Sequence, residues 1–308
     1  MQPTIWNASL STMWAKDRYS NLEDFFIAAR EMGFASIELN HQIDTQQLAG
    51  IDLGKYTFSS VHEPCPADIS TALLRKEDWL ISSEDDDRRR IGVYTVRRSI
   101  DLAAAVGARA VVVHCGNVQD APGLERQMRQ MIRDGQRDSD AYSDILDQFL
   151  RQRAAQVGPR MEAVTKSLKE LLAYAQPKGV RLGLENRFHI MDIPSAPELK
   201  DLLSLASPEA LGFILDVGHA QALDVLGMHP FQAWLDAFST RIIGTHLHDV
   251  IGVDDHHAPG LGEIDYAPVA ACLPAQAFRT FELRSHNTPA QVKAGLQYLV
   301  DRRCVVHI

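Results

Sequence analysis

Short runs of β-branched and other apolar residues alternate along almost the whole chain with amphipathic stretches of helical period. This alternation is typical of repeated strand–helix units, which build a parallel sheet covered by helices. About eight units fit into the chain, the number that closes a barrel. The sequence therefore predicts an α/β fold, a (β/α)8 TIM barrel. The expected strands span residues 4–8, 35–40, 58–62, 110–114, 180–185, 211–216, 241–246 and 279–282.

One strongly charged segment interrupts this rhythm. Residues 117–160 include ERQMRQMIRDGQRDSD and AYSDILDQFLRQRAAQ. Because the segment follows the fourth expected strand, we predict a helical insertion at the active-site face of one barrel domain spanning residues 1–308. A lid, an oligomer contact and a solvated helical excursion without a catalytic part are the open alternatives.

Composition restricts the classes of function. With 45% hydrophobic and 23% charged residues the chain resembles an ordinary globular protein. Its 40 acidic and 31 basic residues give a net charge of −9, which argues against a basic nucleic-acid-binding surface. No stretch has the length and purity of a membrane span, and the first residues lack a signal-peptide pattern. We expect a cytoplasmic enzyme with a small-molecule substrate; a homo-oligomer stays open.

The cysteines give no sign of a thiolate metal site. Cys65, Cys115, Cys272 and Cys304 are scattered and form no CxxC pair. This spacing argues against a thiolate zinc site and against a dense disulfide framework. Buried free thiols are the expected state.

Successive apolar strands end on residue types that bind metals. Each of these residues stands where a barrel strand reaches its mouth. They are His62, His114, Glu185, Asp216, His246 and Glu282. Any one of them alone fits a hydrogen-bonded histidine or a rim ion pair, but clustered imidazoles and carboxylates are costly without a cation or protons. His248 and Asp249 follow His246 closely and are expected to orient a ligand imidazole.

Two loops add further candidates. Asp216 and His219 lie together in DVGH, and Asp254 and His256 lie in DDHHAPGLGEID, with His257 as the alternative to His256. Such spacings are common by chance and also suit helix caps. Because both loops follow barrel strands, we expect them to project into the same mouth.

These motifs resemble the xylose-isomerase-like TIM-barrel superfamily, which contains sugar isomerases and epimerases and the zinc-dependent apurinic endonucleases. The matching portions are LGLEN, LDVGHA, THLHD, the D-x-H-x-x-x-G-x-G pattern from Asp254 and the strand ending at Glu282. In the ketose epimerases the resemblance implies one divalent ion on four positions, two glutamates that handle protons and a substrate-contacting histidine. The ligand positions are Glu185, Asp216, His246 and Glu282, and the histidine is His219. The endonuclease pattern, with up to three zinc ions, adds His62, His114, His219, Asp254 and His256.

Two functions from different classes follow. In an isomerase or epimerase, zinc or manganese polarises a carbonyl and the adjacent hydroxyl while Glu185 and Glu282 move the proton through an enediolate. Residues for oxygen or phosphate contacts are Asn186, Arg187 and Arg284, of which the arginines also fit rim ion pairs. In a phosphodiester hydrolase, clustered zinc ions generate hydroxide.

The region after the second expected strand favours the isomerase. NHQIDTQQLAG contains no arginine or lysine to grip phosphates. We therefore expect a metal-dependent sugar isomerase or epimerase with one ion, and keep the zinc phosphodiesterase as the alternative. A noncatalytic ligand-binding barrel is disfavoured, since both glutamates are present.

Overall fold

The computed structural model describes residues 4–119 and 123–308 and places parallel strands in a closed barrel. The order around the barrel is β1-β10-β7-β6-β5-β4-β3-β2, and every neighbouring pair is parallel. The barrel strands are β1 (Trp6–Ser11), β2 (Phe34–Leu39), β3 (Phe58–His62), β4 (Ala110–Val113), β5 (Arg181–Glu185), β6 (Leu211–Asp216), β7 (Ile242–Leu247) and β10 (Phe278–Phe281). The predicted TIM barrel is thus confirmed.

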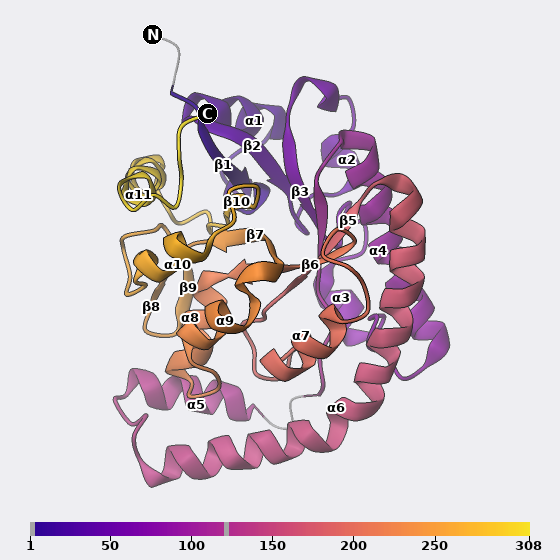
Figure 1. Ribbon diagram of the computed structural model, residues 1–308, viewed down its shortest axis with the longest axis vertical. Helices are drawn as coiled ribbons and strands as arrows, with labels where there is room; N and C mark the ends of the chain where they lie inside the picture. Colours follow the sequence, from indigo (N-terminus) through magenta and orange to yellow (C-terminus); the bar gives the residue numbers. More distant parts are fainter. Residues whose placement is uncertain (1–3, 120–122) are drawn as a thin grey trace.

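Helices surround the barrel, with a small antiparallel hairpin of β8 (Asp249–Ile251) and β9 (Asp254–His257) after β7 (Figure 1). The helices are α1 (Leu22–Glu31), α2 (Thr45–Leu48), α3 (Thr71–Lys76), α4 (Asp86–Val106), α5 (Leu124–Arg133), α6 (Asp140–Ala175), α7 (Ala196–Leu203), α8 (Val217–Val225), α9 (Phe231–Phe238), α10 (Tyr266–Cys272) and α11 (Pro289–Asp301). No helix in residues 4–119 and 123–308 is long and apolar enough to cross a bilayer.

Local sequence explains where the helices begin and end. The side chain of Asp85 accepts hydrogen bonds from the backbone N–H groups of Asp87 and Arg88, which caps the start of α4. The same helix ends on Gly107 in the left-handed conformation, where glycine pays no steric penalty. Its buried side chains, such as Val96 and Ile100, lie on the barrel side. Capping and amphipathicity together fix the span of the helix.

The first strand begins and ends later than the sequence predicted. We expected residues 4–8, but β1 runs from Trp6 to Ser11. Its second half contains buried serines, which hide the apolar signal of a strand. Ser9 nevertheless belongs to the barrel interior, where its Oγ lies 2.9 Å from Thr280 Oγ1.

Glycines inside the barrel make room for large side chains below the mouth. A Cβ on Gly183 would lie 2.6 Å from Ile214 Cγ1, and a Cβ on Gly244 would overlap the ring of Phe278. A small apolar cluster therefore fills the barrel under the mouth; it consists of Ala110, Val112, Ile214, Ile243 and Phe278. This packed floor restricts polar chemistry to the upper end of the strands.

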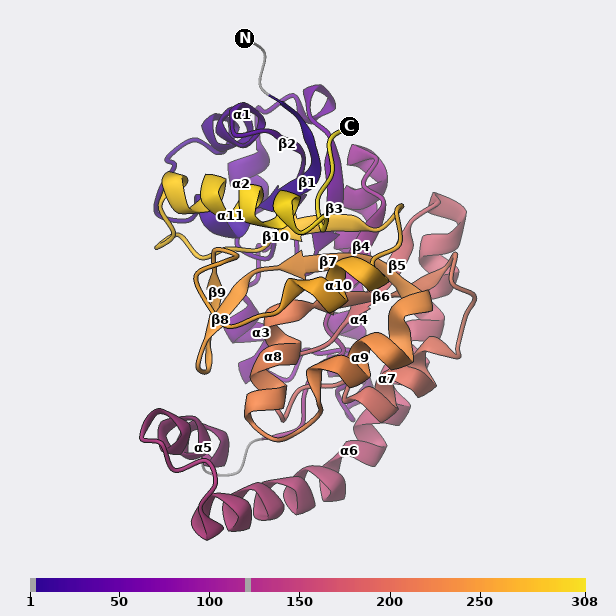
Figure 2. The same cartoon turned by 60° about the vertical axis from the view of Figure 1, so that its left-hand side comes forward.

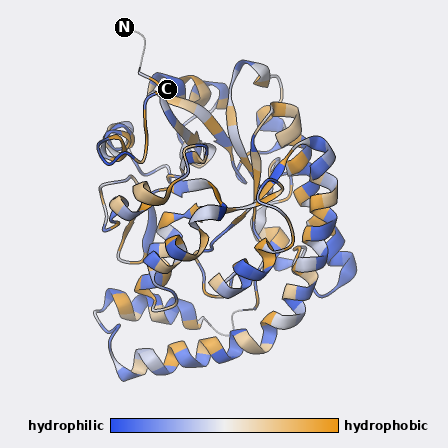
Figure 3. Cartoon of the chain, viewed as in Figure 1, coloured by the Kyte–Doolittle hydropathy of each residue, from blue (hydrophilic) through white to orange (hydrophobic). Residues whose placement is uncertain are grey.

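The segment expected as a helical insertion folds as α5 and the first half of α6. In Figures 1 and 2, α6 runs past the barrel and α5 lies beside its extension. Both helices show alternating hydrophilic and hydrophobic patches in Figure 3. Arg129 of α5 donates to the carbonyls of Phe188 at 2.8 Å and Val253 at 3.3 Å. The helix therefore touches the loop after β5 and the hairpin after β7.

Candidate metal centre

The six strand-end residues gather at one end of the barrel. His62, Glu185 and Asp216 are the last residues of β3, β5 and β6, and His246 is the penultimate residue of β7. His114 and Glu282 directly follow β4 and β10. Parallel strands end on the same side, so the fold brings these residues together as expected.

Four of them form a compact set of donors. Ligand atoms of Glu185, Asp216, His246 and Glu282 all lie within 4.8 Å of one another. Nδ1 of His246 is 2.6 Å from Glu185 Oε1, 3.1 Å from Glu282 Oε2 and 3.6 Å from Asp216 Oδ2. All four residues are at most 2% exposed, so water does not screen their charges.

A buried carboxyl group outside the four donors fixes which nitrogen of His246 faces the other three donors. Nε2 of His246 lies 3.0 Å from Oε2 of Glu38 in β2, and Ser60 Oγ donates to the same oxygen at 2.7 Å. With the Nε2–H donated to Glu38, a neutral ring turns the lone pair of Nδ1 toward three carboxylates. The repulsion between this lone pair and the carboxylates must be offset by a bound cation or by a second proton on the ring.

The donor set fits a divalent cation. Burial alone would lower the pKa of His246, but the carboxylates of Glu282 and Glu38 and hydrogen bonds to Asp216 and Glu185 raise this pKa well above its usual value. The protein alone thus holds a proton where oxygen and nitrogen donors converge. Three carboxylates and one imidazole match the chemistry of zinc or manganese.

His62 and His114 stand side by side at the edge of this set. Nδ1 of His62 lies 3.0 Å from the carbonyl of Glu63, so this nitrogen donates and Nε2 carries the lone pair. Nε2 of His114 lies 3.1 Å from both His62 Nε2 and Glu185 Oε2. Burial, and then the charge of Arg187, lower the pKa of His114 well below its usual value. A neutral His114 can satisfy both neighbours as a donor.

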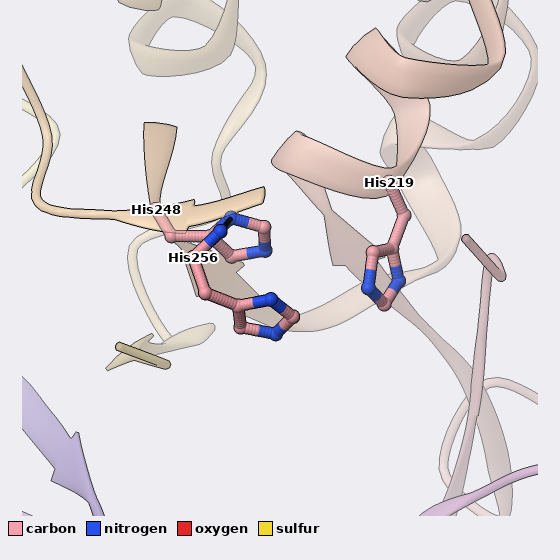
Figure 4. A group of neighbouring side chains, drawn as sticks. All are labelled: His219, His248 and His256. Carbon is pink, nitrogen blue, oxygen red and sulfur yellow. Dashed lines mark hydrogen bonds between the residues drawn. The ribbon is translucent and has the colours of Figure 1, made fainter. Parts of the chain in front are cut away.

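A second group of histidines lies on the other side of the mouth. Figure 4 shows the rings of His248 and His256 stacked, with His219 opposite. Nδ1 of His248 accepts the backbone N–H of His256 at 3.0 Å, so its Nε2–H donates to Asp216 at 2.9 Å. His248 therefore holds a ligand carboxylate and has no free lone pair for a metal. His219 donates through Nδ1 to the carbonyl of Asn186 at 3.0 Å, which leaves its Nε2 free.

Asp254 does not lie where the sequence predicted. Its side chain is 59% exposed and pairs with Arg133 at 2.9 Å, whereas Asp255 is buried and lies 2.8 Å from Nδ1 of His256. The D-x-H pattern selected Asp254, but His256 adopts a left-handed backbone with φ of 61°. This conformation turns residues 255 and 256 toward the mouth together. The carbonyl of His256 is held by the Asn287 amide at 2.9 Å.

The pair of Asp255 and His256 is satisfied without an ion. Burial by itself would lower the pKa of His256, but the neighbouring Asp255 carboxylate raises it to about 10. Arg284 also pairs with Asp255. A protonated His256 and a guanidinium therefore neutralise this carboxylate. His257 points elsewhere: its Nδ1 lies 3.3 Å from Nε2 of the exposed His286.

The residues expected to contact substrate separate into two roles. Asn186 is fully buried, and its amide donates to the carbonyl and accepts from the N–H of Asp216, each at 2.8 Å. This corrects the expected substrate contact, because both ends of the amide are occupied. Arg187 and Arg284 do line the mouth, where Arg187 pairs with Glu185. Asp249 accepts from three backbone N–H groups and so holds the loops after β7 instead of a ligand imidazole.

A cavity of about 450 Å³ lies over these residues. Its walls include His62, Glu185, His219, Arg187 and Glu282, whereas Asp216 and His246 lie beneath its surface. Oε1 of Glu282 is buried and has no hydrogen-bond partner among the described residues. Glu282 thus lines the cavity and carries one unpaired, buried carboxylate oxygen.

Sequence reasoning missed three residues of this site. Glu38 is the penultimate residue of β2, as His246 is of β7, so the signal used for the other strands was present. His41 follows β2, and its ring centroid lies 5.1 Å from that of His62. Burial lowers the pKa of His41 to about 3, so this histidine is neutral. Asp255 was missed because the D-x-H pattern pointed to its neighbour Asp254.

A closed (β/α)8 barrel with buried carboxylates and histidines at the carboxyl ends of its strands defines a TIM barrel with a candidate metal centre. The chain belongs to the xylose isomerase-like TIM barrel family, whose model matches residues 147–302. This confirms the resemblance inferred from the motifs.

Three individual proteins are similar to this chain in sequence or in fold. It is 25% identical over 199 residues to the uncharacterized protein y4fM of Sinorhizobium fredii. The match covers 64% of this chain and 53% of the relative, so the chain spans about half the length of that protein. The structure is similar to that of a D-tagatose 3-epimerase-like protein, with 20% identity, 96% coverage of both chains and a TM-score of 0.64. It is also similar to 3-keto-D-glucoside 4-epimerase from E. coli, with 17% identity, 96% and 99% coverage and a TM-score of 0.64.

Proposed function

We propose that this chain is a divalent-metal-dependent isomerase or epimerase that moves a proton beside a carbonyl in a small polyhydroxylated compound. The observation that carries the proposal is the donor set of Glu185, Asp216, His246 and Glu282, in which Glu282 lines the cavity and has one unpaired carboxylate oxygen. Proton transfer beside a carbonyl needs a base and an electrophile in one place, and this set supplies both. The names of structurally similar epimerases agree with it.

Zinc or manganese would be held by these four residues, and when bound it supplies polarisation of the substrate oxygens. Glu282 takes the proton through Oε1. Burial alone would raise the pKa of Glu282, but the charge of His246 and hydrogen bonds from His246 and His256 hold it well below its usual value. The base is therefore ionised at neutral pH.

Glu185 serves the opposite face of the reacting carbon in this proposal. Its oxygens are in contact with His246, His114 and Arg187. Although burial favours protonation, Arg187 and these hydrogen bonds keep the pKa of Glu185 well below its usual value. His219, with its free Nε2, and Arg187 hold substrate oxygens at the cavity wall.

The charges around the site favour one ion over three. A second cation on His62, His114 and Glu185 would meet the guanidinium of Arg187, which already pairs with Glu185. A third on His219, Asp255 and His256 would have to displace the proton of His256 and compete with Arg284 for Asp255. Both changes cost electrostatic energy that a single ion avoids.

One observation supports the second candidate, a zinc phosphodiester hydrolase. The lone pairs of His62 Nε2 and His219 Nε2 are fixed by backbone carbonyls, as is common for metal-binding histidines. In that case Asp255 takes the ligand role that the resemblance to the endonucleases implied for Asp254. We rank this function second because the positive groups described above occupy the additional sites.

Two measurements on the purified protein test the proposal. Elemental analysis should find one divalent ion per chain, whereas the hydrolase requires two or three. Incubation in deuterated water with a panel of ketoses and related keto compounds should place deuterium beside the carbonyl of at least one compound. Absence of exchange across the panel, together with cleavage of abasic-site DNA, would replace the isomerase by the hydrolase.

A further inference from the structure

A second, smaller cavity opens beside the metal centre. It has a volume of about 280 Å³ and shares four wall residues with the larger one, namely His41, Arg75, His114 and Arg187. The two cavities therefore meet beside the metal ligands. We call the smaller cavity the apolar chamber.

The far walls of the apolar chamber are hydrocarbon. They come from the loop after β3, from α3, from the segment after α3 and from α4, and comprise Pro64, Leu74, Trp79, Leu80, Ile81 and Val96. Gly92 of α4 allows the wall to close, because a Cβ there would lie 2.7 Å from the backbone nitrogen of Ile81. The shape of the chamber is thus built into the packing of α4 against residues 79–81.

Several polar side chains of the chamber pair within the protein, whereas His41 Nδ1 and Asn117 Oδ1 are buried without a hydrogen-bond partner among the described residues. Arg75 pairs with Asp192 at 3.3 Å, and Arg187 pairs with Glu185. The hydroxyl of Thr95 donates to the carbonyl of Ile91 at 3.0 Å. A hydroxylated group placed against the far walls would lose its hydrogen bonds to water and gain few in return. An apolar group would gain by burial.

We propose that the apolar chamber binds a nonpolar substituent, about the size of one six-membered ring, attached to the polyhydroxylated substrate. The substrate class is then a glycoside-like derivative with an apolar aglycone instead of a free sugar. This inference rests on the proposed function in placing the polar part of the substrate at the metal centre. The volume suffices, since an apolar cavity of about 150 Å³ accepts benzene.

Calorimetric titration of the metal-loaded protein with phenyl β-D-glucoside and methyl β-D-glucoside tests the chamber. These probes share the sugar and differ in the ring. We expect the phenyl glucoside to bind at least about tenfold more tightly, as burial of a ring predicts. The Ala72→Trp variant fills the chamber from α3 and should remove this advantage. Leu80→Ala opens the wall and should reduce it.

Leu73→Trp is the matched control. Leu73 is adjacent on α3, is 40% exposed and does not line the chamber, so the advantage of the phenyl probe should persist. Equal affinity for both probes, including no detectable binding of either, overturns the proposal, and so does an undiminished advantage in folded Ala72→Trp. If the protein exchanges no deuterium with any compound of the panel but still binds the phenyl glucoside more tightly than the methyl glucoside, the proposed reaction is refuted while the proposed chamber is supported.

Discussion

Hydrogen bonds to fixed acceptors decide which nitrogen of each histidine is available at the metal centre. His246 gives one nitrogen to Glu38, and His62 and His219 give theirs to backbone carbonyls. His248 is the exception, because its nitrogens are both used by protein groups. The tautomers therefore separate candidate ligands from residues that position them.

Replacement of Glu38 by Gln tests this positioning role. The variant should bind zinc or manganese about 10- to 100-fold more weakly, because Glu38 no longer fixes and polarises His246. Excess metal should restore most of the exchange activity, since Glu38 does not line the cavity. Metal titration followed by calorimetry gives the affinity, with the exposed Glu31→Gln as control. Unchanged affinity would show that Glu38 is structural only.

Glu282→Gln should lower the exchange rate by at least about 100-fold. The substitution replaces the unpaired Oε1 that we assign as the base and also removes one ligand charge. The rate must therefore be measured at saturating metal, with occupancy determined in the same sample. Exchange at the wild-type rate in a metal-loaded variant would exclude Glu282 as the base.

At the scale of elements, α5 connects the two loops that wall the mouth. Glu125 accepts from His189 Nδ1 at 2.8 Å and from the N–H of Ile190 at 2.9 Å, and its partner Arg129 lies over the ring of Phe188. Arg133 contacts Asp254 in the hairpin. The charged segment after β4 thus braces the site; a lid or an oligomer contact stays a prediction.

Arg129→Met should weaken both the fold and the substrate site. Removing one partner of a buried ion pair leaves Glu125 uncompensated and should cost about 3 kcal/mol in unfolding free energy. The loosened loop should raise KM more than it lowers kcat. Urea unfolding and steady-state kinetics provide the two measurements, and exposed Arg126→Met on the same helix is the control. Equal KM values in both variants would argue against the brace.

A second element contact should respond to pH. Arg153 of α6 forms a two-point pair with Glu198 of α7, at 2.6 and 2.7 Å. Burial alone would raise the pKa of Glu198, but the hydrogen bond and charge of Arg153 lower it below the ordinary 4.5. A lowered pKa in the folded state means that the pair stabilises fully above about pH 4.5 and loses its effect as the pH falls through the folded value.

Glu198→Gln should therefore cost about 3 kcal/mol at neutral pH, and the difference from the wild type should shrink below about pH 4.5. Urea unfolding at several pH values between about 6 and 3.5 measures this difference. The exposed Glu162→Gln on α6, the helix of Arg153, should show neither the cost nor the pH dependence. A constant difference across the range would contradict the assigned pair.

For the whole molecule, the metal centre couples ligand binding to stability. The four donors come from β5, β6, β7 and the end of β10, so one ion joins strands on a continuous side of the barrel. A metal ion held by these four donors would bind the folded chain in preference to the unfolded one, because the residues are far apart in sequence. Occupancy should therefore raise the stability of the entire barrel.

Removal of metal with a chelator should lower the Tm by about 5 °C relative to protein with free metal about a hundredfold above its Kd. The stabilisation expected at that ratio is about 2.7 kcal/mol. Differential scanning calorimetry with and without added zinc or manganese measures the shift. An equal Tm in both states would mean that the four donors do not bind the ion in the folded protein.

The barrel fold and the residues at the ends of its strands could be predicted from the sequence alone. The period of the apolar runs specifies strands and helices, and parallel strands must end on one side. Glu185, Asp216 and His246 could therefore be assigned to one mouth from their positions alone. The burial of Ser9 inside β1 could not, because a buried serine gives no apolar signal.

The role of each polar side chain in the site depends on the tertiary structure and could not be predicted from the sequence. The exchange of Asp254 for Asp255 depends on the left-handed backbone of His256, which contacts with Asn287 and His248 maintain. The role of Asn186 depends on its distance from the backbone of Asp216. These roles depend on hydrogen bonds between residues that are distant in sequence. The local periodicity of the sequence does not encode the geometry of such bonds.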